Sequence, residues 1–188
     1  MTLKRIFDFL FALFLIISIA LPAFFLWIAI RLTSKGPGIY WSDRVGKNNI
    51  IFKMPKFRSM IIGTPPIATH LLKNPKSYLT PIGSFLRIYS LDEIPQLLSI
   101  LFGQMSFVGP RPALFNQKDL IKMRTKAGIS LLCPGLTGWA QVNGRDELNL
   151  KEKVNLEIEY IQRVSFIFDL KILWMTFFKV VEKRWVSH

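Results

Sequence analysis

The chain has 188 residues, of which 51% are hydrophobic, and it carries 25 Lys and Arg against 12 Asp and Glu, a formal net charge of +13. This length allows one compact domain plus a membrane element, and so apolar and basic a composition is unusual for a water-soluble enzyme. It favours a protein that buries apolar surface in lipid, lays a basic face on anionic headgroups and binds a polyanion. The single cysteine, Cys133, excludes an intramolecular disulfide and a four-cysteine zinc site.

The first expected element is a hydrophobic helix whose topology the sequence leaves open. From Ile6 to Ile30 the only charged residue is Asp8. At 1.5 Å rise per residue this segment reaches about 35–40 Å, enough to cross a bilayer and too long for the core of a signal peptide. Pro22 removes a helix hydrogen bond and favours a kink, and the basic flanks draw both ends toward the cytoplasm. We therefore expect either an ordinary transmembrane anchor or a kinked helix that enters and leaves one leaflet.

Short strands and helices are expected after this segment. In chain order they are strands at 39–41 and 50–52 around a turn at 46–49, a proline-rich loop at 63–80 with a short helix near 68–72, helices at 82–88, 91–102 and 116–127, turns and short extended pieces at 128–144, and a long helical region from 150. Asn149 is placed to cap that last region. Its latter part, 166–181, is amphipathic, so it lies in the headgroup zone with Trp174 at the interface or packs as a core helix.

Two adjacent carboxylates, Asp92 and Glu93, stand before a proline at the start of an apolar helix. One interpretation is structural, because Ser90 and Glu93 have capping-box spacing and acids favour a helix N-terminus. The other is catalytic. A helix N-terminus keeps a carboxylate ionised and attracts phosphate, so Asp92 is a competent nucleophile toward phosphorus. Glu93 is then available to bind a divalent ion or act as a base, and Mg²⁺ needs only one or two carboxylates plus substrate phosphates.

A rigid arginine loop and a basic edge are candidates for phosphate binding. Pro110 and Pro112 stiffen the loop around Arg111, which suits bidentate contact with a phosphate. Lys56 and Arg58 lie in a basic segment at 53–60. The alternative for the loop is a rigid turn with a solvated arginine, and for the segment a solvated face beside the membrane.

Glycine turns and amides near residue 140 are candidates for nucleotide binding. Turns at 134–138 precede Gln141, Asn143 and Arg145, which are able to contact a base or ribose and a phosphate. Such turns are common, so the pattern is weak by itself. Neither histidine has a Cys or an acid at metal-ligand spacing, and the sequence contains no Walker loop and no dinucleotide fingerprint.

Taken in order, the motifs resemble the bacterial sugar transferase family, the monotopic phosphoglycosyl transferases that start glycan assembly on undecaprenyl phosphate. The segments that carry the resemblance are Lys-Arg-Ile-Phe-Asp at 4–8, the hydrophobic helix with its proline, Lys-Phe-Arg-Ser-Met at 56–60, Ser-Leu-Asp-Glu-Ile-Pro-Gln-Leu at 90–97, Met-Ser-Phe-Val-Gly-Pro-Arg-Pro at 105–112, Pro-Gly-Leu-Thr-Gly at 134–138 and Gln-Val-Asn-Gly-Arg at 141–145. The Asp-Glu-Ile-Pro-Gln and Gly-Pro-Arg-Pro segments are the most specific, and the length is similar to the family's minimal form.

The resemblance implies a mechanism. Asp92 matches the family nucleophile, which attacks the β-phosphate of a UDP-sugar, releases UMP and holds the sugar phosphate as an aspartyl ester. Undecaprenyl phosphate then takes the sugar phosphate. Glu93 matches the second member of the dyad, and the two acids together are the expected Mg²⁺ ligands. The positions expected to contact substrate are Lys56, Arg58, Arg87, Pro110, Arg111, Pro112, Gln141, Asn143 and Arg145.

The resemblance also implies an architecture. We expect an α+β chain, mainly helical, with a re-entrant membrane helix at 1–33 broken at Pro22. A cytoplasmic catalytic domain at 34–188 is expected to carry a short β-hairpin and interfacial amphipathic helices. The expected location is the cytoplasmic face of the bacterial inner membrane, and the expected partners are a UDP-sugar, undecaprenyl phosphate and the bilayer, without nucleic acid. Three residues depart from the family pattern, where Ser, Asp and Arg are usual: Leu21, Gln104 and Cys133.

Two other functions are compatible with parts of the sequence. A membrane-anchored basic protein that binds nucleic acid would explain the net charge, but no recognisable nucleic-acid module is present. A membrane glycosyltransferase that releases UDP would cleave the sugar–oxygen bond, and it gives no reason for a nucleophilic carboxylate aimed at phosphorus. The sequence does not identify the sugar, the glycan pathway or the oligomeric state.

Overall fold

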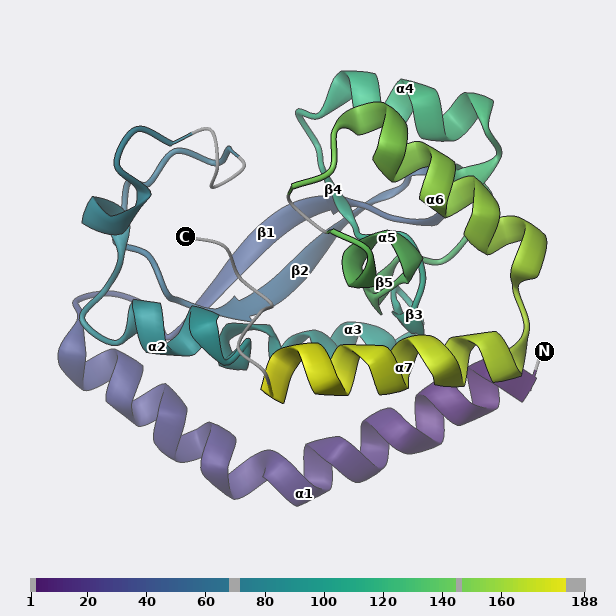
Figure 1. Cartoon of the computed structure of the whole chain (residues 1–188). Helices are drawn as coiled ribbons and strands as arrows, with labels where there is room; N and C mark the ends of the chain where they lie inside the picture. The colour runs from purple at the N-terminus through teal and green to yellow at the C-terminus, as the bar shows by residue number, and fades with distance from the viewer. Residues whose placement is uncertain (1–2, 68–71, 145–146, 182–188) are drawn as a thin grey trace.

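A long N-terminal helix forms the base of the molecule, and the remaining elements are built on it (Figure 1). The computed structural model describes residues 3–67, 72–144 and 147–181. The helices and strands are α1 (Leu3–Thr33), β1 (Ile39–Val45), β2 (Ile51–Phe57), α2 (Gly83–Ile88), α3 (Gln96–Leu101), β3 (Ser106–Val108), β4 (Ala113–Leu114), α4 (Lys118–Lys126), β5 (Gly135–Thr137), α5 (Trp139–Val142), α6 (Leu150–Arg163) and α7 (Phe166–Val181). The chain is thus mainly helical with a small sheet, as the sequence predicts.

Helix α1 is bent near its middle, and its halves form an open V (Figure 1). Pro22 lies inside the helix. It has no N–H, so the carbonyl of Ser18 lacks its helical donor. The Ser18 hydroxyl donates to the carbonyl of Phe14 at 2.8 Å, a back-bond that also bends helices. Two bending features therefore lie within about one helical turn.

One side of α1 packs on the domain and the other is left exposed. Ala12 and Ile30 are buried in two separate core clusters. Among the described residues, α1 is the helix that is long and apolar enough to cross a membrane, and only 6% of its most apolar window is buried. A core helix of a soluble protein would be mostly buried. The exposed large apolar side chains of α1 are Leu3, Ile6, Phe9, Leu10, Leu13, Phe14, Ile17, Leu21, Phe24, Phe25, Trp27 and Leu32.

Charged side chains fix the first turns of α1 to the domain. The Arg5 guanidinium donates to the carbonyls of Ile100 at 2.5 Å and Leu101 at 2.7 Å. These carbonyls lie at the C-terminal end of α3, where a cation is favourable. Asp8 is buried and accepts from the backbone N–H of Phe107 at 3.3 Å. The one acid of the hydrophobic segment is therefore a docking residue.

The expected hairpin is present and longer than predicted. β1 pairs antiparallel with β2, and β4 lies on the other edge of β1. Asn48 and Asn49 at the turn have φ of 56° and 60°, which asparagine tolerates better than most residues. A second sheet, parallel, joins β3 to β5. These strands are only three residues long, too short to show the alternation that predicts a strand.

The helical predictions are confirmed at 82–88, 116–127 and 166–181, within a residue or two at each end. Asn149 caps α6 through a complete capping box with Glu152. The long region expected from 150 is two helices, which break between Arg163 and Phe166. The short helix expected near 68–72 falls mostly outside the described residues.

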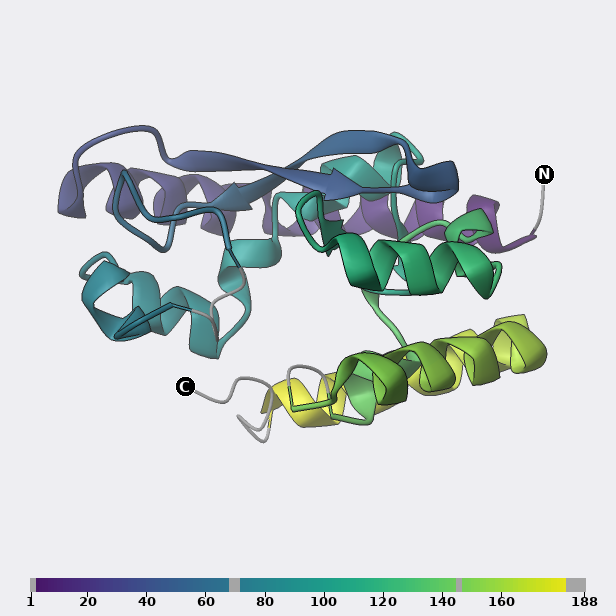
Figure 2. The same cartoon turned by 90° about the horizontal axis from the view of Figure 1, so that it is seen from above.

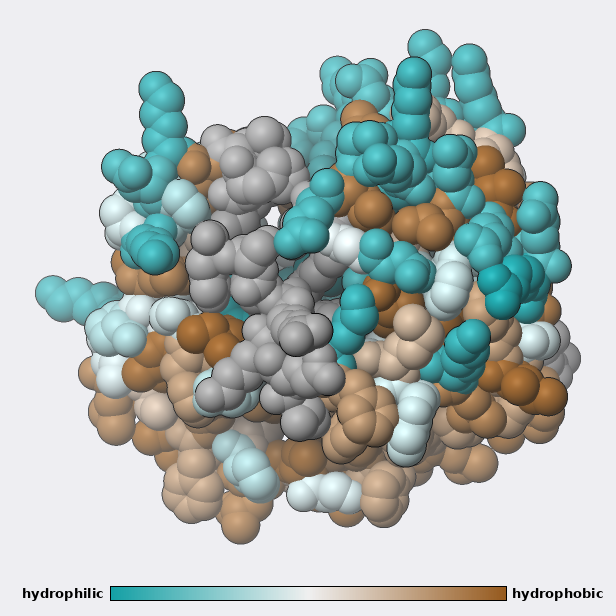
Figure 3. Space-filling view, in the orientation of Figure 1, coloured by the Kyte–Doolittle hydropathy of each residue, from teal (hydrophilic) through white to brown (hydrophobic). Residues whose placement is uncertain are grey.

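Apolar and polar surfaces lie at opposite ends of the molecule. Figure 3 shows hydrophobic side chains gathered over α1, α2 and α7, and hydrophilic ones over α4 and α6. Seen from above, the β1–β2 ribbon and the α6–α7 pair lie on opposite sides, with α4 between them (Figure 2). Helix α7 packs on the core along one side and is exposed along the other, and the expected position of Trp174 in the headgroup zone stays a prediction. Phe168 and Ile172 are buried in the core, whereas Trp174 is 64% exposed.

Candidate active site

The adjacent carboxylates lie in a buried turn between α2 and α3. Leu91–Glu93 forms a 3-10 turn, and Asp92 and Glu93 are each only 8% exposed. Ser90 has a left-handed backbone, with φ of 54°, and its side chain makes no capping hydrogen bond. The capping-box interpretation is therefore wrong, because Ser90 has the backbone of a turn rather than the extended backbone of an N-cap. The Glu93 side chain points instead to cations from other elements.

Three of the predicted cations meet at this pair. Lys56 Nζ lies 2.9 Å from Glu93 Oε1 and 3.9 Å from Asp92 Oδ2. Arg111 Nη2 lies 3.2 Å from the same Glu93 oxygen. Arg87, on α2, is near enough for its charge to lower the pKa of Asp92. Residues from β2, α2 and the loop after β3 thus surround two acids with positive charge, as a phosphate site requires.

Burial shifts the pKa values of Asp92 and Lys56 in opposite directions. Burial raises the pKa of Asp92, and the charge of Glu93 raises it further, while Lys56 opposes both. Burial lowers the pKa of Lys56, and the two acids hold it up. A carboxylate with a raised pKa is a stronger base than an ordinary one, and burial also strips it of hydration. Both properties suit a nucleophile.

Every carbonyl of the Pro110–Pro112 segment has a donor. The Pro110 carbonyl accepts from the Gly135 N–H at 2.9 Å. The Arg111 carbonyl accepts from Arg124 Nη1 at 2.8 Å, and the Pro112 carbonyl from Arg44 Nη1 at 3.1 Å. The prolines and these bonds together hold the Arg111 backbone in one position, which confirms the predicted rigidity of the loop.

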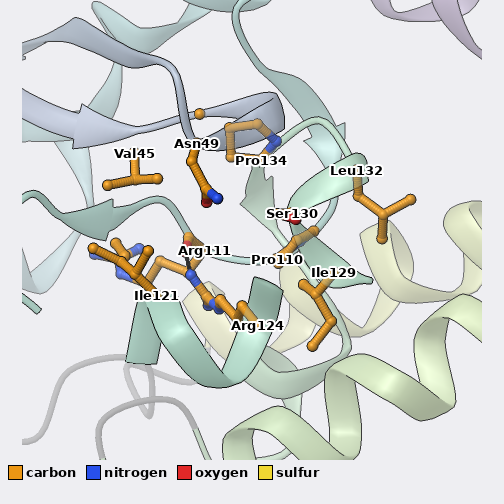
Figure 4. Close-up of a pocket in the computed structure, with 12 residues that line it drawn as sticks. Val45, Asn49, Pro110, Arg111, Ile121, Arg124, Ile129, Ser130, Leu132 and Pro134 are labelled. Carbon is orange, nitrogen blue, oxygen red and sulfur yellow. Dashed lines mark hydrogen bonds between the residues drawn. The ribbon is translucent and has the colours of Figure 1, made fainter. Parts of the chain in front are cut away.

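Arg124 is held in turn by a buried ion pair. Its Nε lies 2.8 Å from Glu157 Oε2, and its Nη2 pairs with the other oxygen of the same carboxylate. Both side chains are buried. Figure 4 shows Arg111 and Arg124 beside a small cavity of about 30 Å³, with Pro110 and Pro134 also on its wall. A space of this size accommodates a few water molecules at most, so we assign it no ligand.

Close backbone approach explains two glycines of the predicted motifs. A Cβ on Gly138 would lie 2.0 Å from the carbonyl oxygen of Gly109, and one on Gly109 would lie 2.4 Å from that of Cys133. No other residue fits at either position without movement of the backbone. Gly138 therefore allows the 134–138 segment to pack directly against the backbone of Gly109, next to the arginine loop.

The other predicted residues that the structure describes have contacts elsewhere in the chain. Arg58 is buried and donates to the carbonyls of Ser34 and Lys35, where it fixes the end of α1. Asn143 is exposed and donates to the carbonyl of Trp139. Gln141 is buried beside Gly138, and neither of its amide atoms has a partner among the described residues. Arg145 lies outside the described residues.

Three residues of the site were not predicted. They are Arg44, Arg124 and Glu157. Arg124 belongs to a basic helix and Glu157 to a charged one, and both patterns are typical of solvated faces. Side chains along a strand alternate between its two faces, and in the β1–β2 hairpin this alternation places Arg44 on the same face as Lys56. It was the one feature of the sequence from which the position of Arg44 could have been predicted.

The donor set fits Mg²⁺ as a two-carboxylate site completed by substrate phosphates. Asp92 and Glu93 offer hard oxygen donors on consecutive residues, which Mg²⁺ prefers. In the part of the chain that the structure describes, no group of three or more His, Cys, Asp or Glu is gathered. Any magnesium at these acids would therefore depend on oxygens of the substrate.

Comparison with known proteins agrees with this geometry. The profile of the bacterial sugar transferases matches residues 1–183. The chain belongs to the bacterial sugar transferase family. This transferase is 36% identical over 181 residues to the uncharacterized sugar transferase EpsL of Bacillus subtilis, covering 96% of this chain and 88% of that protein.

Larger relatives resemble the transferase over one part of their length. It is 37% identical to the UDP-glucose:undecaprenyl-phosphate glucose-1-phosphate transferase of Escherichia coli, covering 94% of this chain but 40% of that protein. It is 33% identical to the undecaprenyl-phosphate galactose phosphotransferase of Salmonella typhimurium, covering 97% of this chain and 41% of that protein. The chain thus spans less than half the length of these two relatives.

Proposed function

We propose that the chain transfers a sugar 1-phosphate from a UDP-sugar to undecaprenyl phosphate in two steps. First, an Asp92 carboxylate oxygen attacks the β-phosphorus, and the bond from that phosphorus to the bridging oxygen breaks. UMP leaves with the bridging oxygen and its electron pair. Second, a phosphate oxygen of undecaprenyl phosphate attacks the same phosphorus, and the bond to Asp92 breaks. The carboxylate is restored, and undecaprenyl diphospho-sugar is the product.

The buried Asp92–Glu93 pair inside a ring of cations is the observation that carries this proposal. Lys56 and Arg111 neutralise charge beside the acids and attract the diphosphate. The names of the relatives add a donor and an acceptor of the expected kinds. Glu93 contacts both cations, so it positions them, and as the neighbour of Asp92 in the same turn it is the candidate base toward the acceptor.

Magnesium is part of the proposal. Asp92 and Glu93 would hold the ion, and it would supply positive charge to the diphosphate oxygens. The residues of the chain have separate tasks. Lys56 lowers the pKa of Asp92 and so favours its ionised form, and Arg111 is held in place for the phosphate, whereas Asp92 alone forms a covalent bond.

The apolar end of the molecule supports insertion into one face of a membrane. Besides α1, exposed apolar side chains gather on α2, α3 and α7, at the end of the molecule where Figure 3 shows hydrophobic surface. They are Phe85, Tyr89, Leu98, Phe102, Ile167, Leu170, Trp174, Phe177 and Phe178. A bent α1 dipping into the lipid beneath these helices would place the acids near the headgroups, where the acceptor phosphate lies. We therefore propose a re-entrant α1 at the cytoplasmic face of the inner membrane.

The re-entrant topology predicts that both ends of α1 lie on one side. In a Cys133→Ser background, single cysteines at Leu3 and Lys35, which are both exposed, report each end. We expect a membrane-impermeant maleimide to label neither in intact cells and both in inverted vesicles. Labelling of one end from each side would show instead that α1 spans the bilayer.

The raised pKa of Asp92 predicts an unusual pH dependence. Only the ionised carboxylate attacks phosphorus, so the rate of adduct formation should rise with pH through the pKa of Asp92. Because burial raises that pKa, the midpoint should lie above the ordinary carboxyl value of about 4. Lys56→Met removes a charge that lowers the same pKa, so the midpoint should move further up. Infrared absorption of the carboxyl group in the metal-free protein, with Asp92→Asn as the reference, measures both midpoints, and a midpoint near 4 in the parent protein would contradict this assignment.

Identification of the released nucleotide tests the reaction. The protein in detergent is given Mg²⁺, undecaprenyl phosphate and a panel of UDP-sugars, and UMP and UDP are measured separately. UMP with one or two sugars would support the proposal and name the donor. UDP would indicate cleavage of the sugar–oxygen bond and overturn it. Salt-sensitive binding of nucleic acid that is unaffected by Asp92→Asn, without release of either nucleotide, would favour the basic-protein alternative.

A further inference from the structure

Arg44 lies on the same face of the β1–β2 ribbon as Lys56. Antiparallel pairing sets Tyr40 opposite Lys56, and alternation along β1 then turns Ser42 and Arg44 to that face. Four residues along a strand span about 13 Å, so Arg44 and Lys56 approach the acids from two ends. The ribbon thus brings two cations to the site, of which the sequence motifs include only Lys56.

The Arg44 guanidinium is held in place. Its Nε donates to Ser42 Oγ at 3.0 Å, and its Nη1 donates to the carbonyl of Pro112 at 3.1 Å. These bonds use two of the five N–H donors of a guanidinium. Because Pro112 follows Arg111, the same loop fixes both arginines next to each other. An arginine with a fixed orientation loses little conformational entropy when it binds a phosphate.

The placement of the two arginines is unfavourable without an anion. Burial and the charge of Arg111 lower the pKa of Arg44 to about 10, and Glu93 only partly compensates. Two neighbouring guanidinium groups repel each other, and a low dielectric strengthens the repulsion. A phosphate bound between them would remove it. The ionised diphosphate of a nucleotide sugar carries the opposite charge.

Position along the ribbon indicates which phosphate Arg44 would meet. Lys56 Nζ lies 3.9 Å from Asp92 Oδ2, whereas Arg44 stands four residues further along the ribbon, where its Nη1 donates to the carbonyl of Pro112 at 3.1 Å. Arg44 therefore lies at the end of the site away from Lys56, the cation next to Asp92. In a phosphoryl transfer the attacking and leaving oxygens are roughly in line, so the leaving group lies opposite the nucleophile.

We propose that Arg44, beside Arg111, binds the phosphate that leaves with the nucleotide and stabilises the charge that develops on it. The inference rests on the proposed function, and it assigns Arg44 to the phosphate position opposite Asp92. When the bond between the two phosphates breaks, the electron pair goes to the bridging oxygen on UMP, and the fixed N–H groups of Arg44 bond that phosphate. In the second half-reaction the acceptor phosphate attacks in line from the position that UMP has left, so Arg44 would bind that phosphate as well.

The half-reactions are separable, which gives a test. For Arg44→Met we expect UMP release from the donor alone to slow about 10²–10³-fold, the range found for loss of one preformed donor to a developing anion. UMP should also compete more weakly with the donor. After long incubation to form the adduct and removal of UMP, transfer to undecaprenyl phosphate should also slow, because the acceptor phosphate attacks from the position that UMP has left. Arg44→Lys, which keeps the charge but not the fork, should fall between Arg44→Met and the parent protein.

Lys53→Met is the matched control. Lys53 lies on the other face of the same ribbon, exposed and paired with Asp43 at 2.8 Å, so its loss removes one charge without touching the acids. Its half-reactions should equal those of the parent protein. Parent-like UMP release by Arg44→Met would overturn the inference. Parent-like competition by UMP in a folded Arg44→Met would do so as well, because it would show that Arg44 does not contact the leaving phosphate.

The controls separate failure of the inference from failure of the proposed function. If the parent protein releases no UMP, the proposed function fails. If the parent releases UMP and Arg44→Met matches it, only the inference fails. Thermal unfolding of each variant checks that it is folded, and if Arg44→Met does not fold, Arg44→Lys gives the decisive comparison. Parent-like UMP competition in a folded Arg44→Lys would then overturn the inference.

Discussion

Asp92→Asn is expected to lower sugar-phosphate transfer by about 10⁴-fold or more, the scale of loss when a covalent nucleophile is removed. The amide oxygen of asparagine is uncharged and cannot form the ester with phosphorus. The direct measurement is the mass of the intact protein after incubation with donor and without acceptor. The parent protein should gain the mass of one sugar phosphate, and Asp92→Asn should gain none.

The control for this experiment is Asp119→Asn. Asp119 is an exposed acid in the first turn of α4, so its loss changes the net charge equally without reaching the site. It should form the adduct at the parent rate. Glu93→Gln distinguishes the two acids of the turn. An adduct that persists in Asp92→Asn and disappears in Glu93→Gln would transfer the nucleophilic role to Glu93.

Asp92→Asn should also make the protein more stable. Because burial raises the folded-state pKa of Asp92, the fold favours the protonated acid. The stability from that preference is present below the unfolded-state pKa and is lost as pH rises through the folded-state pKa. At neutral pH the ionised carboxylate therefore costs stability, and an uncharged asparagine avoids the cost. We expect a higher thermal midpoint for Asp92→Asn at pH 7 and a smaller difference in acid, a conflict between stability and activity that is common at active sites.

The sequence predicted the centre of the site well because its motifs are local. Asp92 and Glu93 are adjacent, and Arg111 lies between two prolines, so both segments could be recognised within a few residues. The order of the motifs also resembles a known family, which suggested that Lys56 and Arg87 belong with them. The hairpin and the capped helix at Asn149 follow from short-range turn and capping rules, and both are present.

The supporting residues could not be predicted because long-range packing determines them. Arg124 and Glu157 are 33 positions apart, and only the packing of α4 and α6 brings them together. Arg58, which is expected at the substrate, donates to three acceptors on Ser34 and Lys35 just after α1. Local spacing contains no information about such partners. A charged residue that is buried by a distant element lies in the same local sequence pattern as a charged residue that is exposed to solvent.

The buried pair of Arg124 and Glu157 gives the second large prediction. Glu157→Gln leaves the Arg124 charge buried without its partner, which costs about 3–5 kcal/mol in such pairs. For a protein of this size that corresponds to a fall of roughly 6–20 °C in the thermal midpoint. The control is Asp43→Ala, which breaks the exposed pair with Lys53 and should cost less than about 1 kcal/mol. Unfolding in detergent, followed by tryptophan fluorescence, measures both.

A double substitution then separates stability from positioning. Arg124→Met with Glu157→Leu removes both charges and leaves apolar side chains, so most of the lost stability should return. The carbonyl of Arg111 would still lack the donor that Arg124 supplies at 2.8 Å. We therefore expect a stable variant whose KM for the UDP-sugar stays raised, because Arg111 is no longer held rigid. A double variant with parent-like KM would show that the prolines alone position Arg111. A double variant as unstable as Glu157→Gln would mean that shape, rather than charge pairing, makes this contact stabilising.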